Sequence, residues 1–289
     1  MSQPKKQNYL NNKDILKEIH NSKLTFCYVE DRVLYGKFDV ILNSVEEIFS
    51  NIDVAKQNRA NNIQQENYNI AMGDYDSTNY RNKPKQKDFL VNIDSIDINE
   101  LVFRVMTYEH IPLEEGRKKN PKNEADEKAK VNFPPFKHYI ITDLKTKQLN
   151  EVARSHWKGD LVNGKFSVSH GRITNSLGTM FLKLVERYSH RANWRGYTYV
   201  DEMRGQALVQ LSQVGLQFNE AKSDNPFAYY TAAVNNSFTR VLNLEKRNQN
   251  IRDDILIEQG HLPSYSRQIA HEEEMRQMRE GSESSEVYE

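Results

Sequence analysis

The sequence predicts a mainly α protein, with a bundle of helices in its C-terminal half and a less regular α+β segment, interrupted by disordered loops, before it. Three observations support this fold class. Apolar residues recur with helical spacing from Asn175 onward. Strand-like patterns occur in short runs in the preceding segment. Residues 56–88 and 114–130 are rich in amides or charges and poor in aliphatic side chains, so burial there could hardly offset the entropy of ordering.

Composition narrows the class of protein but not its function. The 289 residues are 37% hydrophobic, and Lys plus Arg and Asp plus Glu both total 40, so any electrostatic signal must be local. The single Cys27 cannot form an internal disulfide, which fits a reducing cytosol. No apolar run approaches the roughly 18 to 20 residues of a membrane span, and no signal peptide is visible. We expect a soluble, intracellular protein.

Along the chain, the N-terminal half holds one clear helix and several weaker elements. The stretch YLNNKDILKEIH places Asn11 or Asn12 as an N-cap before Ile15, Leu16 and Ile19. A strand is expected at His138–Thr142, after two prolines. The expected parts are an N-terminal helix segment at 1–23, an insert of uncertain fold at 24–115 with a disordered loop at 56–88, a linker with a short strand and turns at 116–170, a helical domain at 171–262 and a flexible tail at 263–289.

Three amphipathic helices are predicted in the C-terminal half. The first carries a stripe of Leu177, Met180, Phe181, Leu184, Val185 and Tyr188. The second runs from about Thr198 to Phe218 and turns Met203, Ala207, Leu208, Leu211, Val214 and Phe218 inward. The third begins at the Asn225 cap with Pro226 at its first position and turns Phe227, Tyr230, Val234, Phe238 and Val241 inward, toward an end near Arg247. A fourth, shorter helix is expected over Arg252–Gln259.

The outer side of the third helix combines side chains that suit nucleic acid. Its outward residues are Tyr229, Asn236, Arg240, Asn243 and Arg247. Amides can bond base edges, arginines can bond phosphate or guanine, and an exposed tyrosine can stack on an unpaired base. Between residues 225 and 252, Arg240, Lys246, Arg247 and Arg252 stand against the single acid Glu245. An ordinary solvated helix face is the alternative reading.

The C-terminal half resembles region 2 of bacterial sigma factors, in the variant of the late-transcription sigma factors of T4-like bacteriophages. The order of parts matches: a helix ending in RY, a link GYT, a helix with an acidic start, the turn LQFNEAKSDNPFAYYT and a helix ending in bases. The N-terminal NYLNNKDILKEI is similar to the start of such phage proteins. Residues 24–170 have no counterpart in their short versions, so 171–262 is the part that is sigma region 2-like.

The resemblance implies a non-enzymatic subunit that directs the host RNA polymerase core to late promoters, in the cytoplasm of an infected bacterium. Residues implied to bind the coiled coil of the largest polymerase subunit are Asp201, Glu202, Arg204, Gln206 and Gln210. The resemblance and the outward stripe together imply a second set of residues, which binds promoter DNA. These residues would bind the non-template strand of the melted, A·T-rich −10 element: Tyr229, Tyr230, Asn235, Asn236, Arg240, Asn243 and Arg247. Stacking on aromatics, at about 1 to 3 kcal/mol per base, offsets the cost of flipping.

The sequence departs from the family at two places. Where housekeeping sigma factors have two tryptophans that wedge the duplex open, this chain has Ala233 and Val234, which leaves Tyr229, Tyr230 or Trp194 to stack. Phage late factors also use a small coactivator and the sliding clamp, which they contact through a hydrophobic C-terminal motif. Only Val287 and Tyr288 are available here for that contact.

Two other classes of function remain open. One is a nucleic-acid-binding module without polymerase contact, and the other is a phage structural or interaction protein whose residues 24–170 carry the function. An enzyme is disfavoured, because no spacing of paired carboxylates, metal ligands or a phosphate loop is readable. We therefore expect no catalytic residues, no metal and no cofactor. The dispersed His138, His156 and His170 are interpreted as structural rather than metal-binding residues.

Overall fold

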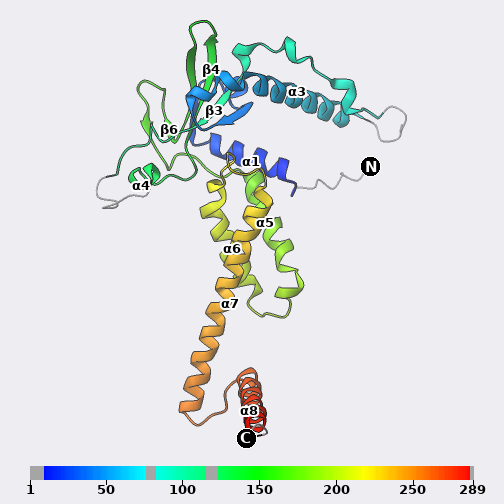
Figure 1. Cartoon of the computed structure of the whole chain (residues 1–289), viewed down its shortest axis with the longest axis vertical. Coiled ribbons are helices and arrows are strands. Elements are labelled where there is room, and N and C mark those ends of the chain that lie inside the picture. The colour runs from blue at the N-terminus through cyan, green and yellow to red at the C-terminus, as the bar shows by residue number, and fades with distance from the viewer. Residues whose placement is uncertain (1–9, 76–82, 115–122, 287–289) are drawn as a thin grey trace. The chain divides into compact units, whose positions relative to one another are not determined.

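The structure of the chain is a computed structural model that describes residues 10–75, 83–114 and 123–286, with side chains described as far as residue 279. It consists of two units, labelled by their elements in Figure 1. The first unit comprises residues 1–184 and 211–231, and the second comprises residues 185–210 and 232–289. Among the described residues, no helix combines the length and the apolar character that crossing a bilayer requires.

The described elements are a mixture of helices and strands up to Phe166 and are helical from Asn175 onward. The helices are α1 (Asn12–Leu24), α2 (Arg32–Tyr35), α3 (Ile52–Asp74), α4 (Glu124–Glu127), α5 (Asn175–Ser189), α6 (Val200–Val214), α7 (Pro226–Glu258) and α8 (Tyr265–Glu286). The strands are β1 (Cys27–Val29), β2 (Val40–Leu42), β3 (Phe103–Met106), β4 (Phe136–Asp143), β5 (Gln148–Ser155), β6 (Trp157–Lys158) and β7 (Lys165–Phe166). Short 3-10 turns lie between them.

The first unit is built on a five-stranded mixed sheet in the order β1-β5-β4-β3-β2. All neighbours are antiparallel except β2 and β3, which are parallel. The predicted strand at 138–142 lies within β4. The prediction of a mainly α fold is nevertheless wrong, and the structure is mixed α/β. The central strand β3 was hard to read because it is covered on both faces and so lacks the alternation of a half-exposed strand: Phe103, Arg104 and Val105 are all buried.

Helix α3 occupies much of the stretch where the sequence predicted a disordered loop at 56–88, and that prediction is wrong for residues up to Asp74. The helix packs into the core beside the sheet through small residues, Ala55 and Ala60, which are buried. Further along, Gln64 Nε2 donates a hydrogen bond to the carbonyl of Gln86 at 2.7 Å. An amide-rich helix is therefore ordered by tertiary contacts rather than by a broad apolar stripe.

The predicted N-terminal helix is confirmed as α1. Asn11 is its N-cap, and the Asn11 side-chain oxygen accepts a hydrogen bond from the amide of Asp14 at 2.7 Å. Ile15 and Ile19 are buried, as the spacing indicates. The Asn12 side-chain oxygen accepts a hydrogen bond from the amide of Phe227 at 3.1 Å, so the start of α1 also caps the start of α7.

A fully buried arginine lies within the first unit. The Arg104 guanidinium lies between the rings of Phe38 and Phe136, at 3.9 and 3.8 Å from their centroids. Its Nε donates to His138 Nε2 at 3.0 Å, and its Nη1 lies 3.2 Å from His20 Nδ1. Burial and the neighbouring Arg104 charge hold the pKa of His138 well below its usual value.

One acid compensates this buried positive charge. The side chain of Glu220 is 6% exposed and lies 3.4 Å from His20, and both of its carboxylate oxygens accept hydrogen bonds from Lys23 Nζ, at 2.6 and 2.7 Å. Burial alone would raise the pKa of Glu220, but Lys23 and Arg104 lower it. Lys23 also donates to the carbonyl of Phe218 at 2.7 Å, which ties the chain before α7 to α1.

The inward stripes of the three long helices are largely confirmed. In α5, all six residues of the stripe are buried: Leu177, Met180, Phe181, Leu184, Val185 and Tyr188. Along the second stripe, Met203, Ala207, Leu211 and Phe218 are buried, whereas Leu208 and Val214 are half-buried. In α7, Tyr230, Val234, Phe238 and Val241 are buried and Phe227 is half-buried.

The C-terminal elements differ from the prediction. Helix α7 is continuous to Glu258, so the separate helix expected at 252–259 does not form. Within the stretch expected as a flexible tail at 263–289, residues 265–286 form α8. The Asp253 carboxylate explains its start, because it accepts hydrogen bonds from the Ser264 amide at 2.8 Å and the Ser264 hydroxyl at 2.6 Å.

Some predictions fall on positions outside the described residues. These are residues 76–82 of the expected loop, residues 116–122 of the expected linker, and the two residues proposed for clamp contact, Val287 and Tyr288.

Candidate nucleic-acid interface

In the second unit, one side of α7 presents amides and arginines to solvent. Asn236, Arg240, Asn243 and Arg247 are all exposed and recur at the spacing of one helix face. Among the described residues, none of these four side chains makes a hydrogen bond or an ion pair. The buried side chains of the same helix anchor this face, so its polar groups are free to meet a ligand.

Asn235 has a different role from its neighbour. Its side-chain oxygen accepts a hydrogen bond from the Tyr188 hydroxyl at 2.6 Å, although the residue as a whole is exposed. The Tyr188 ring packs edge-on against Phe238, with centroids 5.3 Å apart. The Asn235 carbonyl thus holds α5 against α7 and is not available to a base edge while this bond persists.

The two predicted tyrosines lie in the first unit and differ in exposure. Tyr230 is fully buried, its hydroxyl donates to the carbonyl of Gly215 at 2.6 Å, and its ring packs edge-on against Phe181 at 4.9 Å. Burial raises the pKa of its phenol. Tyr229 is half-buried, with its ring 5.5 Å from that of Phe218. Tyr229 can therefore offer part of its ring to a base, whereas Tyr230 belongs to the core.

Trp194, the third stacking candidate, is also a core residue. It is 7% exposed, and its ring centroid lies 5.2 Å from Phe238 and 6.2 Å from Tyr188. At the two positions where the sequence resemblance would place wedge tryptophans, Val234 is buried and Ala233 is half-buried. The described structure therefore offers no exposed aromatic wedge in the middle of α7.

The predicted polymerase-binding side chains lie along α6, between its first turn and Gln210, in the second unit. Asp201, Glu202 and Gln206 are exposed, and Gln210 is half-buried. Arg204 is engaged within the chain: its Nη1 lies 3.0 Å from an Asp201 oxygen, and its Nε donates to the Ser189 hydroxyl at 2.8 Å. Three of the five predicted side chains are thus fully presented to solvent.

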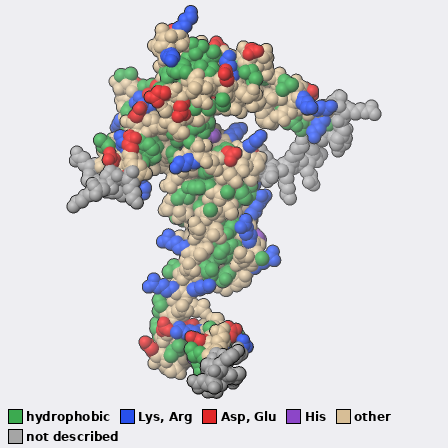
Figure 2. Space-filling view, in the orientation of Figure 1, with side chains coloured by type: hydrophobic (Ala, Val, Ile, Leu, Met, Phe, Trp, Pro, Cys, Tyr) green, Lys and Arg blue, Asp and Glu red, His purple; other side chains and the backbone are tan. Residues whose placement is uncertain are grey.

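Sequence reasoning missed a second basic segment in the same unit. Arg187, Arg191 and Arg195 are exposed around the end of α5, and Arg191 stacks over the Tyr188 ring at 4.3 Å. Their spacing of four residues was a readable signal. Residues 185–210 and 232–252 together hold eight Lys and Arg against four Asp and Glu, so this part of the chain is basic although the whole is neutral. Figure 2 shows Lys and Arg side chains in blue along the helices α5 to α7.

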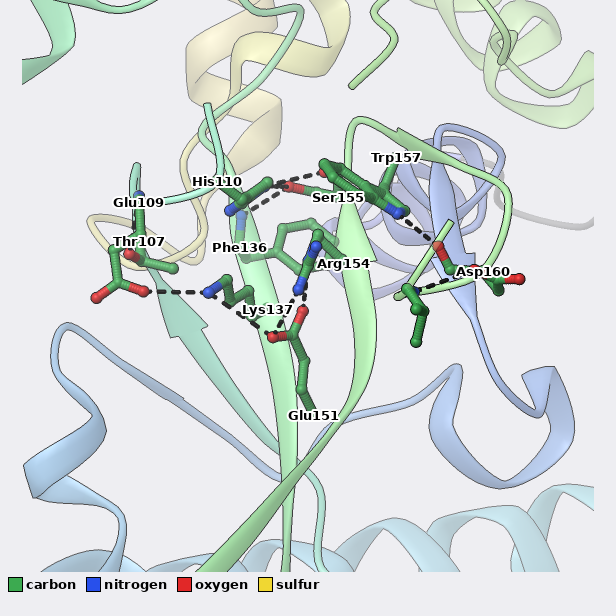
Figure 3. Close-up of polar contacts among 11 residues, drawn as sticks. Thr107, Glu109, His110, Phe136, Lys137, Glu151, Arg154, Ser155, Trp157 and Asp160 are labelled. Carbon is green, nitrogen blue, oxygen red and sulfur yellow. Dashed lines mark hydrogen bonds and ion pairs between the residues drawn. The ribbon is translucent and has the colours of Figure 1, made fainter. Parts of the chain in front are cut away.

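A polar cluster on β4 and β5 of the first unit is shown in Figure 3. Lys137 Nζ lies 3.1 Å from a Glu109 oxygen and 3.7 Å from a Glu151 oxygen. Arg154 pairs with Glu151 at 2.6 Å and covers the Trp157 ring at 4.4 Å. Burial alone would lower the pKa of Lys137, but the carboxylates of Glu151 and Glu109 raise it. These charges satisfy one another, which indicates a structural cluster.

The histidines of the first unit are likewise structural in their geometry. His110 Nε2 lies 3.0 Å from the carbonyl of Ser155, and His156 is fully buried with its ring 4.1 Å from that of Phe133. Burial lowers the pKa of His110 to about 4 and that of His156 to about 3. Within residues 10–75, 83–114 and 123–286, no group of three or more His, Cys, Asp or Glu side chains could hold a metal ion.

Comparisons of the chain with protein-family models, with curated proteins and with solved structures gave no match.

Proposed function

We propose that this protein is a phage late-type sigma factor that binds the core of a bacterial RNA polymerase and recognises and melts the −10 element of late promoters. The observation that carries the proposal is the exposed set Asn236, Arg240, Asn243 and Arg247, which has no partner among the described residues and lies on a helix whose opposite side is buried. The local excess of basic residues supports it. The order of the sequence parts resembles that of region 2 in phage late sigma factors, and this resemblance is the reason for proposing a role in late transcription.

In this proposal the protein is not an enzyme. It opens the promoter by binding the unpaired −10 strand more tightly than the duplex. Arginines contact phosphates and set the register, while amides contact base edges. The half-buried ring of Tyr229 is the stacking candidate, and Tyr230 supports it from the core. Asp201, Glu202 and Gln206 form the contact with the polymerase coiled coil. A sliding clamp and a small coactivator are further proposed partners, and the cytoplasm of an infected bacterium is the proposed location.

A binding experiment with full-length protein and bacterial core polymerase tests the polymerase contact. The parent should co-purify with the core enzyme, and Asp201→Lys combined with Gln206→Glu should weaken that interaction. Both side chains are exposed, so the substitutions should change stability by less than about 0.5 kcal/mol. Glu186→Lys, an exposed position on α5, serves as the matched charge control. Equal binding by the parent and the α6 variant would argue against this face.

A DNA experiment tests the α7 face. Arg240→Ala and Arg247→Ala should each weaken holoenzyme binding to promoter DNA and reduce the dependence of log affinity on log salt by about one phosphate contact. Lys246→Ala, exposed on the same helix but off this face, should have the smaller effect. Permanganate reactivity of the −10 segment, on duplex and on pre-melted templates, reports opening. An unchanged salt dependence in both arginine variants would mean that the face is only solvated.

A second candidate function is a nucleic-acid-binding module without polymerase contact. The engagement of Arg204 by Asp201 and Ser189 favours it, because part of the polar side of α6 is already satisfied within the chain. This candidate predicts DNA binding by the free protein and no co-purification with core polymerase. The two experiments above therefore separate the two candidates.

A further inference from the structure

The distal half of α7, in the second unit, leaves large apolar side chains in solvent. Leu244, Ile251 and Ile255 are 54%, 46% and 48% exposed. Together with the half-buried Asn248 they recur at spacings of four, three and four residues, which is the spacing of a coiled-coil seam. We call these four residues the distal stripe.

Helix α8 and the turn before it contact the other side of α7. Gln249 Nε2 donates to the Ser264 and Ser266 hydroxyls at 3.1 and 2.9 Å. The Arg267 guanidinium donates to the carbonyl of Asn250 at 3.2 Å and lies 2.7 Å from an Asp254 oxygen. Asp253, which bonds Ser264, also points to that side. The distal stripe is therefore left open by the part of this chain that the structure describes.

The charged residues beside the distal stripe favour one orientation of a second, identical helix over the other. With Asn248 at heptad position a, Glu245 and Arg252 occupy e positions, and Arg247 and Asp254 occupy g positions. In a parallel pair, g of one helix lies beside the following e of the other, which places Arg247 against Arg252. In an antiparallel pair, e lies beside e and g beside g. Glu245 then meets Arg252 of the second copy, and Arg247 meets Asp254, whose carboxylate also pairs with Arg267 of its own chain.

The antiparallel arrangement also matches the apolar layers. It places Leu244 against Ile255 of the second copy, and Asn248 against Ile251. The two Asn248 side chains fall in adjacent central layers, where a polar residue in the seam specifies register at a cost in stability. The Asn248 amide already donates to Glu245 Oε1 at 3.3 Å, so it is partly satisfied in each copy.

We propose that the distal stripe binds the same stripe of a second copy of this chain, as a short antiparallel coiled coil flanked by Glu245–Arg252 and Arg247–Asp254 ion pairs. The proposal does not depend on promoter binding. The seam spans less than two heptads beyond the buried Val241, so the dimer is weak and dissociates on dilution.

Sedimentation equilibrium of the full-length protein over a range of concentrations measures this dimer. Ile251→Asp should raise the dissociation constant about tenfold or more. Ile257→Asp is the matched control, because Ile257 is 48% exposed on the same helix but lies off the distal stripe. A parent that remains monomeric at its highest soluble concentration would overturn the proposal. So would equal weakening by the stripe variant and the control.

A charge reversal tests the orientation. In the antiparallel dimer Arg252→Glu places two carboxylates together and should weaken association about tenfold, and the double variant Glu245→Arg with Arg252→Glu should restore it. In a parallel dimer the single variant would instead relieve the repulsion with Arg247. Stronger association of Arg252→Glu, or no rescue by the double variant, would therefore refute the antiparallel pairing.

Discussion

Arg104 shows at the scale of one residue how this protein holds a charge in its core. Its guanidinium is fully buried between two phenyl rings and bonded to histidines that remain neutral, and Lys23 adds a second buried cation nearby. Glu220 is the acid that faces both cations among the described residues. A buried charge is tolerated only when an opposite charge compensates it. Removing the Glu220 carboxylate should therefore reduce stability more than removing one of the two cations that it faces.

This asymmetry can be tested. Glu220→Gln leaves two buried cations uncompensated and should lower the free energy of unfolding by about 3 to 5 kcal/mol. Lys23→Met keeps one cation against one acid, so its cost should be clearly smaller. Urea denaturation of both variants, with Glu202→Gln as an exposed control, gives the comparison. Equal losses for the two core variants would show that charge balance is not what Glu220 provides.

Helix α7 joins a buried side and a presented side in one element. The two sides can be separated experimentally. Phe238→Ala removes a fully buried ring that contacts Tyr188 and Trp194, and it should cost about 3 to 5 kcal/mol. Asn236→Ala and Asn243→Ala should leave the melting temperature nearly unchanged while weakening promoter binding by the holoenzyme. Thermal melts and DNA binding measured on the same preparations decide between these roles, and a strongly destabilised Asn236→Ala would contradict the presented side.

The stability of helix α8 should depend on the hydrogen bonds at its start, because α8, as far as its side chains are described, lacks the buried side that stabilises α7. Its described side chains are mostly exposed, and its N-terminal serine is bonded by Asp253. Hydrogen bonds from Ser264 lower the pKa of Asp253. Ser264→Ala removes the hydroxyl that donates to Asp253 and should therefore reduce helicity at the start of α8, with a local cost of about 1 kcal/mol. Far-ultraviolet circular dichroism and amide exchange of residues 265–279 measure the loss, and His271→Ala, at an exposed position of α8, is the control. Unchanged exchange in Ser264→Ala would show that the hydrogen bond between Ser264 and Asp253 does not sustain the helix.

For the molecule as a whole, acid sensitivity follows from its buried histidines. Burial, with the charges of Arg104 and Lys23, lowers the pKa of His20 to about 3, against 6.5 in an unfolded chain. Burial likewise lowers that of His156 to about 3. Below pH 6.5 the unfolded chain binds protons that the folded protein does not accept until about pH 3 to 4. Stability is thus fully present above pH 6.5 and is lost as the pH falls through this window.

We expect the urea midpoint to fall between pH 7.5 and pH 5, before ordinary carboxylates titrate. His156→Asn should reduce this dependence on pH, and an asparagine tolerates the positive φ of 53° at that position. Asn193→Ser, at an exposed site without an ionisable side chain, should leave the dependence as it is in the parent. A midpoint that does not change over this range, or an equal effect of the two substitutions, would contradict the role assigned to the buried histidines.

The sequence by itself determined the local features of this protein, namely helices, a helix cap and the side chains that a helix presents. The helical stripes of α5, α6 and most of α7 are visible in residue spacing, because an amphipathic helix repeats its pattern within a few turns. The cap at Asn11 and the presented residues Asn236, Arg240, Asn243 and Arg247 follow from the same local periodicity. The identity of a ligand for that face stays a prediction, since spacing shows which side chains are presented and not what they bind.

Tertiary structure alone decided the features that join distant segments. The strand at 138–142 was predicted, but its place in a five-stranded sheet was not, because cover on both faces removes the alternation of β3. Helix α3 escaped prediction because small residues such as Ala55 supply its packing. The bond between Tyr188 and Asn235, and the meeting of Lys23, Arg104 and Glu220, connect residues far apart in the chain. Burial, hydrogen bonding and charge balance depend on such neighbours in space, and local patterning carries no record of them.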